Sequence, residues 1–489
     1  MVLGPWSGDA RGHKNPGPRT KNGPGTKDHG QRTVSVWACL PLLAGLYLPF
    51  LGGGLLTDDF AHIVHLSTIE SPARLIDGPD AFGFYRPVTQ ASLAATPGLH
   101  GNHPSQARAF NVALHALVIA MAFVVGRLVL PSPLAAGLAA LAFALTPKAP
   151  SIAVLWISAR GELLVALFSL TSIATWIMWT RRGRAWWLAA ALAAYGLALL
   201  SKETATLLPV LLLLTPRSER PLAARAGAVI GFIALALVIY AWRSQTGALT
   251  PFAGGEHYSP AISVALWLRN AINYAGRMIA APIALVILIG LARLTAKARS
   301  MPFGSYSVLI PFDVLAFAAA FVVVFLAPVL PISLRSELYL YLPVFGVCLF
   351  AGWVGGLFVE APGRLKAAST VVVAVALYVI ALGGYQIARA RDAQQDLRFS
   401  ENLVTALRRD RLLASTTSSV VLIPSDRATE RSLQTAIGGY LHVVLQYAFD
   451  GPPRAGAVQY SSEPPRLADV RLMCTYRETD GTVVISPAP

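Results

Sequence analysis

The most regular feature of the chain is a series of long apolar runs, separated by polar segments, over its first four-fifths. Several runs have roughly eighteen or more residues, enough to cross a hydrocarbon core of ~30 Å as a helix. Apolar length and loop charge together predict about eleven crossings. They are Val34–Leu56, Ala109–Leu130, Leu134–Thr146, Ile152–Thr180, Trp186–Leu200, Thr204–Leu214, Leu222–Trp242, Ala261–Leu294 (an interfacial helix running into a span), Pro311–Leu330, Leu338–Phe358 and Ala367–Ala388. We therefore expect an all-α polytopic membrane domain over residues 34–388.

The composition supports a membrane protein and excludes several other classes. The chain is 55% hydrophobic and 13% charged, whereas a soluble domain has about 25% charged residues. The net charge of +15 does not indicate a nucleic-acid partner, because basic stripes with interleaved aromatic residues are absent. Cys39, Cys348 and Cys474 are too few and too scattered for a disulfide framework or a zinc site.

The basic residues of the short loops predict the orientation. Residues 1–33 are basic and lack a hydrophobic pattern, so we expect a disordered cytoplasmic tail. With this tail inside, four basic loops also lie inside, as the positive-inside rule requires. They hold Arg181/Arg182/Arg184, Arg217/Arg220/Arg225, Arg293/Lys297/Arg299 and Arg364/Lys366. An odd number of crossings places the C-terminus outside, most simply at a bacterial inner (plasma) membrane.

Residues 389–489 are more polar and predict a small extracytoplasmic α/β domain. Two segments have helical periodicity, Asp396–Leu413 and Thr429–Phe449. Four segments have the composition of strands. They are Ser419–Ile423, Ala455–Tyr460, Val470–Tyr476 and Thr482–Ile485.

Charged residues gather in the five loops that this topology places outside. The first outer loop, 57–108, carries Asp58-Asp59, His62, His65 and Tyr85-Arg86-Pro87; later loops bring Lys148, Arg160, Glu162, Lys202, Glu203, Glu256, Arg269, Arg277, Arg335, Glu337 and Tyr339. Ionisable groups near the membrane are costly and usually mark a site. Adjacent carboxylates raise one pKa and supply a base, and arginines and a lysine opposite them suit a phosphate. This pattern suggests group transfer from a lipid-linked phosphate.

Each of these residues also has a structural interpretation. Asp58-Asp59 can cap a helix that starts at Phe60. His62 and His65 can serve as metal ligands with the aspartates, but more often such histidines are interfacial polar residues. Lys202-Glu203 can form an ion pair at a tight turn, and Arg269 can extend to lipid headgroups. The convergence of charge from five separate loops favours a site.

Several motifs, in order, resemble GT-C-type glycosyltransferases. The resemblance is closest to the protein O-mannosyltransferase branch that uses dolichyl- or polyprenyl-phosphate mannose. It rests on Asp58-Asp59, Tyr85-Arg86-Pro87, Asn111 to His115, Ala142 to Pro147, Trp156 to Leu164, Ser201-Lys202-Glu203-Thr204 and Glu337 to Pro343, and it covers roughly Leu55 to Gly346. Thr146 and Leu338 depart from the pattern, standing where histidine and arginine are frequent. Residues 389–489 show no tetratricopeptide period, which leaves the acceptor open.

The resemblance implies an inverting transfer of one sugar from a polyprenyl-phosphate donor to an acceptor hydroxyl or amine. Asp58 is the expected general base, and Asp59 is expected to orient the acceptor or to support the charge at the anomeric carbon. The expected phosphate-binding residues are Arg86, Arg160, Lys202 and Arg269, with Tyr85, His62, Glu162, Glu203, Arg335 and Tyr339 supporting them. No cofactor is required, and a divalent metal is not favoured. The acceptor can be a protein, a lipid or a glycan.

Two other functions fit a polytopic protein with charged loops. A transporter or flippase of an anionic lipid or solute needs charges at mid-membrane positions and repeat-related halves, neither of which the sequence shows. A polymerase or ligase of surface polysaccharide is expected to have a large outer loop late in the chain, whereas the longest loop here is the first. The glycosyltransferase is therefore the leading prediction.

Overall fold

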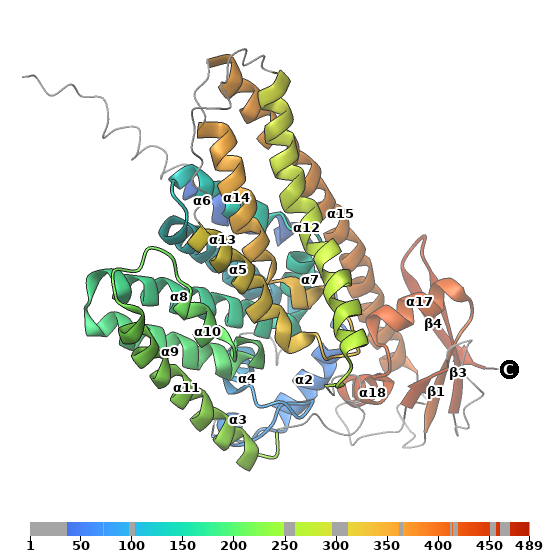
Figure 1. Ribbon diagram of the computed structural model, residues 1–489. Coiled ribbons are helices and arrows are strands. Elements are labelled where there is room, and N and C mark those ends of the chain that lie inside the picture. The colour runs from blue at the N-terminus through green and yellow to red at the C-terminus, as the bar shows by residue number, and fades with distance from the viewer. Residues whose placement is uncertain are drawn as a thin grey trace, which may run out of the picture.

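The computed structural model describes residues 37–71, 73–96, 103–248, 260–295, 312–360, 365–410, 413, 419–449, 456–459 and 470–488. It has a large helical part and a small C-terminal sheet (Figure 1). The predicted tail, residues 1–33, lies outside the described residues. So do Glu256, Lys297, Arg299 and Arg364 of the predicted loops.

All elements of the described chain before residue 410 are helices. In order they are η1 Leu40–Phe50, α2 Asp58–Ser67, α3 Arg74–Asp77, α4 Pro87–Ala94, α5 Pro104–Val129, α6 Pro133–Ala144, α7 Ala149–Leu155, η2 Ile157–Ala159, α8 Arg160–Arg182, α9 Ala185–Ser201, η3 Glu203–Ala205, α10 Leu208–Leu213, α11 Leu222–Gln245, α12 Val264–Thr295, α13 Phe312–Leu326, η5 Ala327–Val329, η6 Glu337–Leu340, α14 Val344–Glu360 and α15 Leu365–Arg409.

The length and composition of these helices indicate a multi-pass membrane protein. Six helical segments of the described chain are long and apolar enough to cross a membrane, or seven if the bent pair α6–α7 forms one span. Large apolar side chains also point outward where a lipid would cover them, as Leu237 on α11 and Ile380 on α15 do. The predicted total of about eleven crossings stays a prediction, since η1, α9, α10 and α14 are shorter apolar helices.

One predicted span is divided in the structure. Residues 152–180 were expected to form one helix, but Ile152 to Leu155 belong to α7, and η2 separates them from α8. The axes of α6 and α7 differ by 63° at the intervening turn, where Lys148 has a positive φ of 65°. Pro147 and Pro150 bracket this turn, and proline disfavours continuation of the preceding helix.

Two other helices are longer than expected. The interfacial segment and span predicted over 261–294 form one helix, α12, which runs for 32 residues. The last span and the first helix of the C-terminal domain also form one helix, α15, of 45 residues. The predicted domain boundary at 388/389 therefore lies inside α15. Buried Ala390 belongs to the membrane-domain core and buried Leu397 to the next core, so apolar contacts continue along the helix without a break.

The described residues of the C-terminal domain form a four-stranded mixed sheet and two short helices. The strands are β1 Val420–Pro424, β2 Gly456–Val458, β3 Val470–Arg477 and β4 Thr482–Pro487, in the order β2-β1-β3-β4. β1 is parallel to β2 and β3, and β4 is antiparallel to β3. The helix predicted over 429–449 is two helices, α17 Arg427–Ala436 and α18 Leu441–Phe449. They are divided at Gly438, whose φ of +52° favours glycine.

The first predicted outer loop and the C-terminal domain share one apolar core. Phe60 and Ile63 of α2 lie in the same buried cluster as Leu403 of α15, Leu433 of α17 and Leu441 of α18. Figure 1 shows α2 beside α18 at the base of the helical part. Hence the helix that carries Asp58 is held by residues from the other end of the chain.

A buried arginine fixes the chain just before α2. Arg108 of α5 is fully buried and donates to the carbonyl oxygens of Leu51, Gly53, Gly54 and Leu155. The chain here runs against α15 so closely that a Cβ on Gly53 would lie 2.6 Å from the Cβ of Leu397 and one on Gly54 would lie 2.8 Å from the Glu401 backbone nitrogen. Glycine at both positions is therefore required by the close approach.

Candidate functional site

A cavity of about 340 Å³ lies between α2, the α9–α10 turn, the end of α11 and the segment before α14. This volume is within the range of small-molecule sites. The lining comprises Asp58, His62, Phe82, Phe84, Arg86, Trp156, Ser158, Ala159, Lys202, Glu203, Thr204, Tyr240, Arg243, Pro260, Pro328, Val329, Ile332, Leu334, Ser336, Leu338 and Tyr339. The structure thus brings together six of the predicted site residues: Asp58, His62, Arg86, Lys202, Glu203 and Tyr339.

Asp58 stands at the first turn of α2 with its side chain on the cavity wall. Burial raises the pKa of Asp58 from 3.8 to about 6. A hydrogen bond from Tyr440 and the charge of Arg86 oppose this rise, whereas the charges of Asp59 and Asp80 add to it. Such a carboxylate is ionised at neutral pH and basic enough to accept a proton from a reacting group.

Asp59 points away from the cavity. It is 1% exposed, and its two carboxylate oxygens accept hydrogen bonds from the backbone N–H groups of Ser158 (2.7 Å) and Leu56 (3.2 Å). Arg108 lies near enough to favour its charged form. The adjacent carboxylates therefore have different surroundings: Asp58 faces the cavity, and Asp59 joins α2 to the turn before α8.

Two arginines flank one glutamate on the wall across from α2. Arg86 donates to both oxygens of Glu203, from Nε at 3.1 Å and from NH2 at 2.5 Å. Arg243, at the end of α11, places NH1 4.0 Å from Glu203 Oε2. Burial would raise the pKa of Glu203, but Arg86, Lys202 and Arg243 together bring it down to about 2. Glu203 is thus an anion that orients the Arg86 guanidinium, whereas Arg243 is oriented by donating from Nε to Ala248 O at 2.7 Å.

Lys202 is the third cation of the cavity. Its Nζ forms an ion pair with Glu162 of α8, and both side chains are almost fully buried. The ammonium group also lies 5.4 Å from the centre of the Tyr339 ring, a cation–π distance. Glu162 and Tyr339 therefore fix the position of Lys202, as Glu203 does for Arg86.

Arg160 has a structural position that differs from the predicted one. Its side chain is fully buried and does not line the cavity. Nε donates to Asn111 Oδ1 (2.8 Å), NH1 to Ser92 O and Thr96 Oγ1, and NH2 to Ala107 O. All three guanidinium nitrogens are thus occupied by α4 and α5. Asn111, from a motif of the family resemblance, completes this contact by donating to Val154 O at 3.2 Å.

Three further predicted residues, Arg269, Arg335 and Tyr85, do not line the cavity. Arg269 and Arg335 are exposed and do not contribute to its lining. Tyr85 is buried beside the lining residue Arg86 but does not itself line the cavity. His62 does line it, with its ring 5.2 Å from that of Phe82, and burial lowers its pKa to about 4, which keeps it neutral. Across the described residues, no three His, Cys, Asp or Glu side chains lie close enough together to hold a metal ion.

Sequence reasoning missed two residues of this site. Arg243 lies in the last turn of a strongly apolar helix. An arginine at such a position usually extends to lipid headgroups. Tyr440 belongs to the C-terminal domain and bonds Asp58, a contact between residues far apart in the sequence. The signal for Arg243 was its place between an apolar run and a predicted outer loop. No local pattern marked Tyr440.

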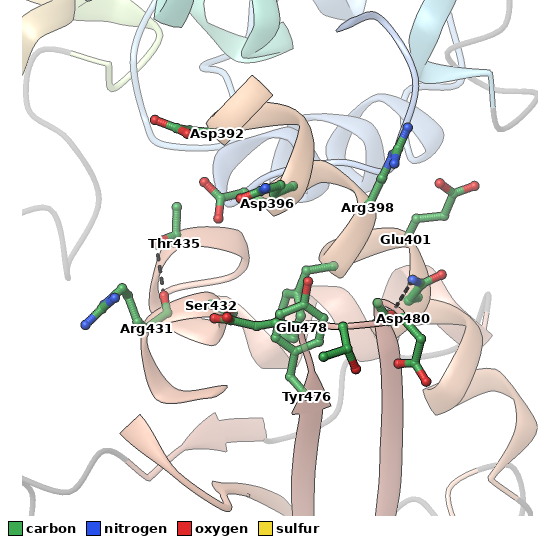
Figure 2. A pocket seen from close by; sticks show the side chains of 15 residues that line it. Asp392, Asp396, Arg398, Glu401, Arg431, Ser432, Thr435, Tyr476, Glu478 and Asp480 are labelled. Atoms are coloured by element: carbon green, nitrogen blue, oxygen red, sulfur yellow. Dashed lines mark hydrogen bonds between the residues drawn. The ribbon is translucent and has the colours of Figure 1, made fainter. Parts of the chain in front are cut away.

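A larger hollow, about 1060 Å³, lies in the C-terminal domain between α15, α17 and the β3–β4 turn. Figure 2 shows the carboxylates of Asp392, Asp396, Glu478 and Asp480 around it. Arg398 and Arg431 also belong to its wall. It shares no lining residue with the cavity at Asp58. Its acidic character does not suit a phosphate, so the smaller cavity is the candidate site.

Comparison with solved structures gives the fold. The chain resembles apo ArnT from Cupriavidus metallidurans, with a TM-score of 0.51 and 14% identity over 92% of this chain and 94% of ArnT. It also matches ArnT bound to undecaprenyl phosphate (TM-score 0.49, 13% identity, 93% and 94% covered) and the apo Archaeoglobus fulgidus oligosaccharyltransferase (0.44, 11%, 84% and 64%). The match to apo ArnT confirms the predicted GT-C fold. No protein-family model and no curated protein matches the sequence.

Proposed function

We propose that the chain is an inverting glycosyltransferase that moves a single sugar from a polyprenyl-phosphate donor to an acceptor hydroxyl or amine. One observation carries this proposal: a carboxylate with a raised pKa, Asp58, lines the same cavity as three cations, Arg86, Lys202 and Arg243. A base and an anion-binding group are the two elements that transfer from a sugar phosphate needs. The ArnT structure with undecaprenyl phosphate suggests the class of lipid to test.

In the proposed reaction, the acceptor oxygen or nitrogen attacks the anomeric carbon of the sugar. A bond forms between these two atoms while the bond from the anomeric carbon to the phosphate oxygen breaks. The phosphate leaves with the electron pair, and Asp58 takes the proton of the acceptor. Arg86, Lys202 and Arg243 stabilise the negative charge that grows on the departing lipid phosphate.

The cations of the cavity are held in place before a ligand binds. Two nitrogens of Arg86 are bonded to Glu203, and among the described residues NH1 has no hydrogen-bond partner. The guanidinium therefore keeps its plane fixed and retains donors for a ligand. In this proposal Glu162 and Glu203 position the cations, and Arg160, Arg269 and Arg335 are not phosphate ligands.

Removing Arg243 should weaken the binding of the lipid phosphate. We expect Arg243→Ala to raise the KM for the donor about tenfold to a hundredfold, since a charge-assisted hydrogen bond contributes about 1.5–3 kcal/mol. Undecaprenyl phosphate, added as a competitor, should inhibit the variant correspondingly less. Arg184→Ala is the matched control because Arg184 is exposed at the opposite end of α8 and α9. Equal inhibition of the two variants would remove Arg243 from the phosphate site.

The raised pKa of Asp58 predicts the pH dependence of transfer. Only the ionised carboxylate can accept the acceptor proton, so kcat/KM should fall as the pH drops through about 6, the pKa of Asp58. An unperturbed aspartate would keep its activity down to about pH 4. The measurement is the initial rate of transfer across this range, with donor binding recorded at the same pH values. A rate that is level down to about pH 4 would contradict the assignment.

The basic residues support a cavity on the non-cytoplasmic face. The basic ends of several helices meet at the end of the helical part that is opposite the cavity: Arg181 donates to Leu128 O, Arg217 to Leu130 O, Arg220 to Gly183 O and Arg293 to Phe358 O. α8 begins directly after Ala159, a residue of the cavity wall, and ends at Arg182, at this basic end. By the positive-inside rule this end is cytoplasmic, so we propose an outward-facing site, in a bacterial inner membrane.

The direct test uses the purified full chain in lipid nanodiscs. It is incubated with a radiolabelled polyprenyl-phosphate monosaccharide, first the mannosyl form and then other hexosyl and pentosyl forms, together with envelope protein, lipid and glycan fractions as acceptors. We expect label to leave the donor lipid and to appear in one acceptor fraction. A flippase would instead move label across a sealed vesicle membrane without breaking the bond to phosphate, and that outcome would overturn the proposal.

A further inference from the structure

Among the described residues, the segment between α17 and α18 brings the C-terminal domain to Asp58. Thr57, directly before Asp58, donates its backbone N–H to Ala436 O at 2.8 Å. Thr57 has a φ of +36°, a region that residues other than glycine rarely adopt. Because such a conformation is unfavourable, it needs contacts that maintain it. The hydrogen bond to Ala436 supplies one such contact.

Tyr440 extends this contact to the carboxylate itself. Its hydroxyl bonds to Asp58, and its ring lies 6.0 Å from the ring of Phe82, another residue of the cavity wall. The ring of Phe82 in turn lies 5.2 Å from that of His62. One side of Asp58 is therefore held by the C-terminal domain, and the other side is left to the cavity.

We infer that Tyr440 is a positioning residue for the reaction: from the segment between α17 and α18, its hydroxyl donates to Asp58 and keeps the carboxylate directed into the cavity. This inference rests on the proposed function, and it gives the C-terminal domain a specific part in catalysis. A hydrogen bond to the charged form of a carboxylate stabilises that form. A base that is held in the reactive orientation also lowers the reaction barrier more than one that rotates freely.

The other groups that act on Asp58 do not replace Tyr440. The negative charges of Asp59 and Asp80 favour the protonated form of Asp58. The positive charge of Arg86 favours the ionised form, but Arg86 is also bonded to Glu203. His62, on the same helix, is neutral because burial lowers its pKa. Lys202, Glu203 and Arg243 belong to the same wall but form ion pairs of their own. Tyr440 is thus the residue of the C-terminal domain that forms a hydrogen bond with Asp58.

The test compares Tyr440→Phe with Tyr447→Phe in the full chain in nanodiscs. Tyr447 is the matched control because it lies on α18, contacts Phe60 of α2 with its ring at 5.3 Å, and bonds Arg408 rather than Asp58. We expect Tyr440→Phe to lower kcat about tenfold, with the KM for the polyprenyl-phosphate sugar unchanged. The acidic limb of the pH profile should move to higher pH. The unfolding midpoints of the two variants should agree.

If the kcat and the pH profile of the two variants coincide, the inference is wrong even though transfer occurs. If the wild-type chain transfers no sugar, the proposed function fails, and the contact is tested directly. Infrared titration, with each spectrum recorded against the same protein carrying Asp58→Asn, reports the carboxyl group of Asp58. A higher midpoint in Tyr440→Phe than in Tyr447→Phe would support the inference, and equal midpoints would overturn it.

Discussion

Replacing Asp58 with asparagine should lower the rate of sugar transfer by about three orders of magnitude, since a positioned base contributes roughly a hundredfold to ten-thousandfold. The amide keeps the shape of the side chain but cannot accept the acceptor proton. Arg86, Lys202 and Arg243 remain in place on the cavity wall. We therefore expect the binding of undecaprenyl phosphate to be nearly unchanged. The measurement is single-turnover transfer of label from the donor, together with a binding isotherm for the lipid phosphate.

Asp77→Asn is the matched control for this variant. Asp77 lies in the same polar segment, at the end of α3, and its side chain is exposed. The same substitution there should leave transfer and donor binding unaltered. Turnover of the Asp58→Asn protein within about tenfold of the wild type, with both proteins equally folded, would exclude Asp58 as the base.

Replacing Arg108 with alanine should destabilise the protein by about 3–5 kcal/mol, because each buried carbonyl oxygen left without a donor costs about 1–3 kcal/mol. Four carbonyl oxygens, those of Leu51, Gly53, Gly54 and Leu155, would lose their donor. Asp59 would also lose the positive charge that Arg108 places near it. We expect a lower yield of monodisperse protein and a lower midpoint of thermal unfolding in detergent.

Two further variants distinguish lost contacts from lost charge. Arg108→Lys keeps the charge but cannot reach four acceptors, because an ammonium group is compact and a guanidinium is a planar fork. It should therefore lie between the wild type and Arg108→Ala. Arg74→Ala, at an exposed position on α3, should unfold as the wild type does. An Arg108→Ala protein as stable as Arg74→Ala would show that the carbonyls find other donors.

Much of the fold could be predicted because the membrane and the sheet each impose a simple pattern. A span must satisfy its own backbone, so apolar length alone identified α5, α11 and α13. The four expected strands agree with β1 to β4 to within a few residues, since β-branched and aromatic residues are enriched in strands. What the pattern missed was continuity: Arg389 and Asp392 suggested a domain boundary, yet α15 passes through them.

The site was predictable only in part because a charge in a sequence does not reveal its partner. Asp58 and Asp59 are neighbours in the sequence, but one faces the cavity and the other is bonded to Ser158. Arg160 and Arg86 both follow apolar or aromatic segments, and only Arg86 reaches the cavity. Such differences depend on where α5 and α9 pass in space, which no local pattern encodes.

The continuous helix α15 also has a mechanical consequence. At 1.5 Å per residue, its 45 residues extend roughly 65 Å without a flexible joint. β4, α17 and α18 all contact this helix. The sheet is therefore held at a fixed distance and angle relative to the apolar helices that α15 contacts. Under the proposed function, an acceptor must diffuse to an opening that does not move, so the encounter rate should depend on whether the acceptor travels in the membrane plane or through the surrounding water.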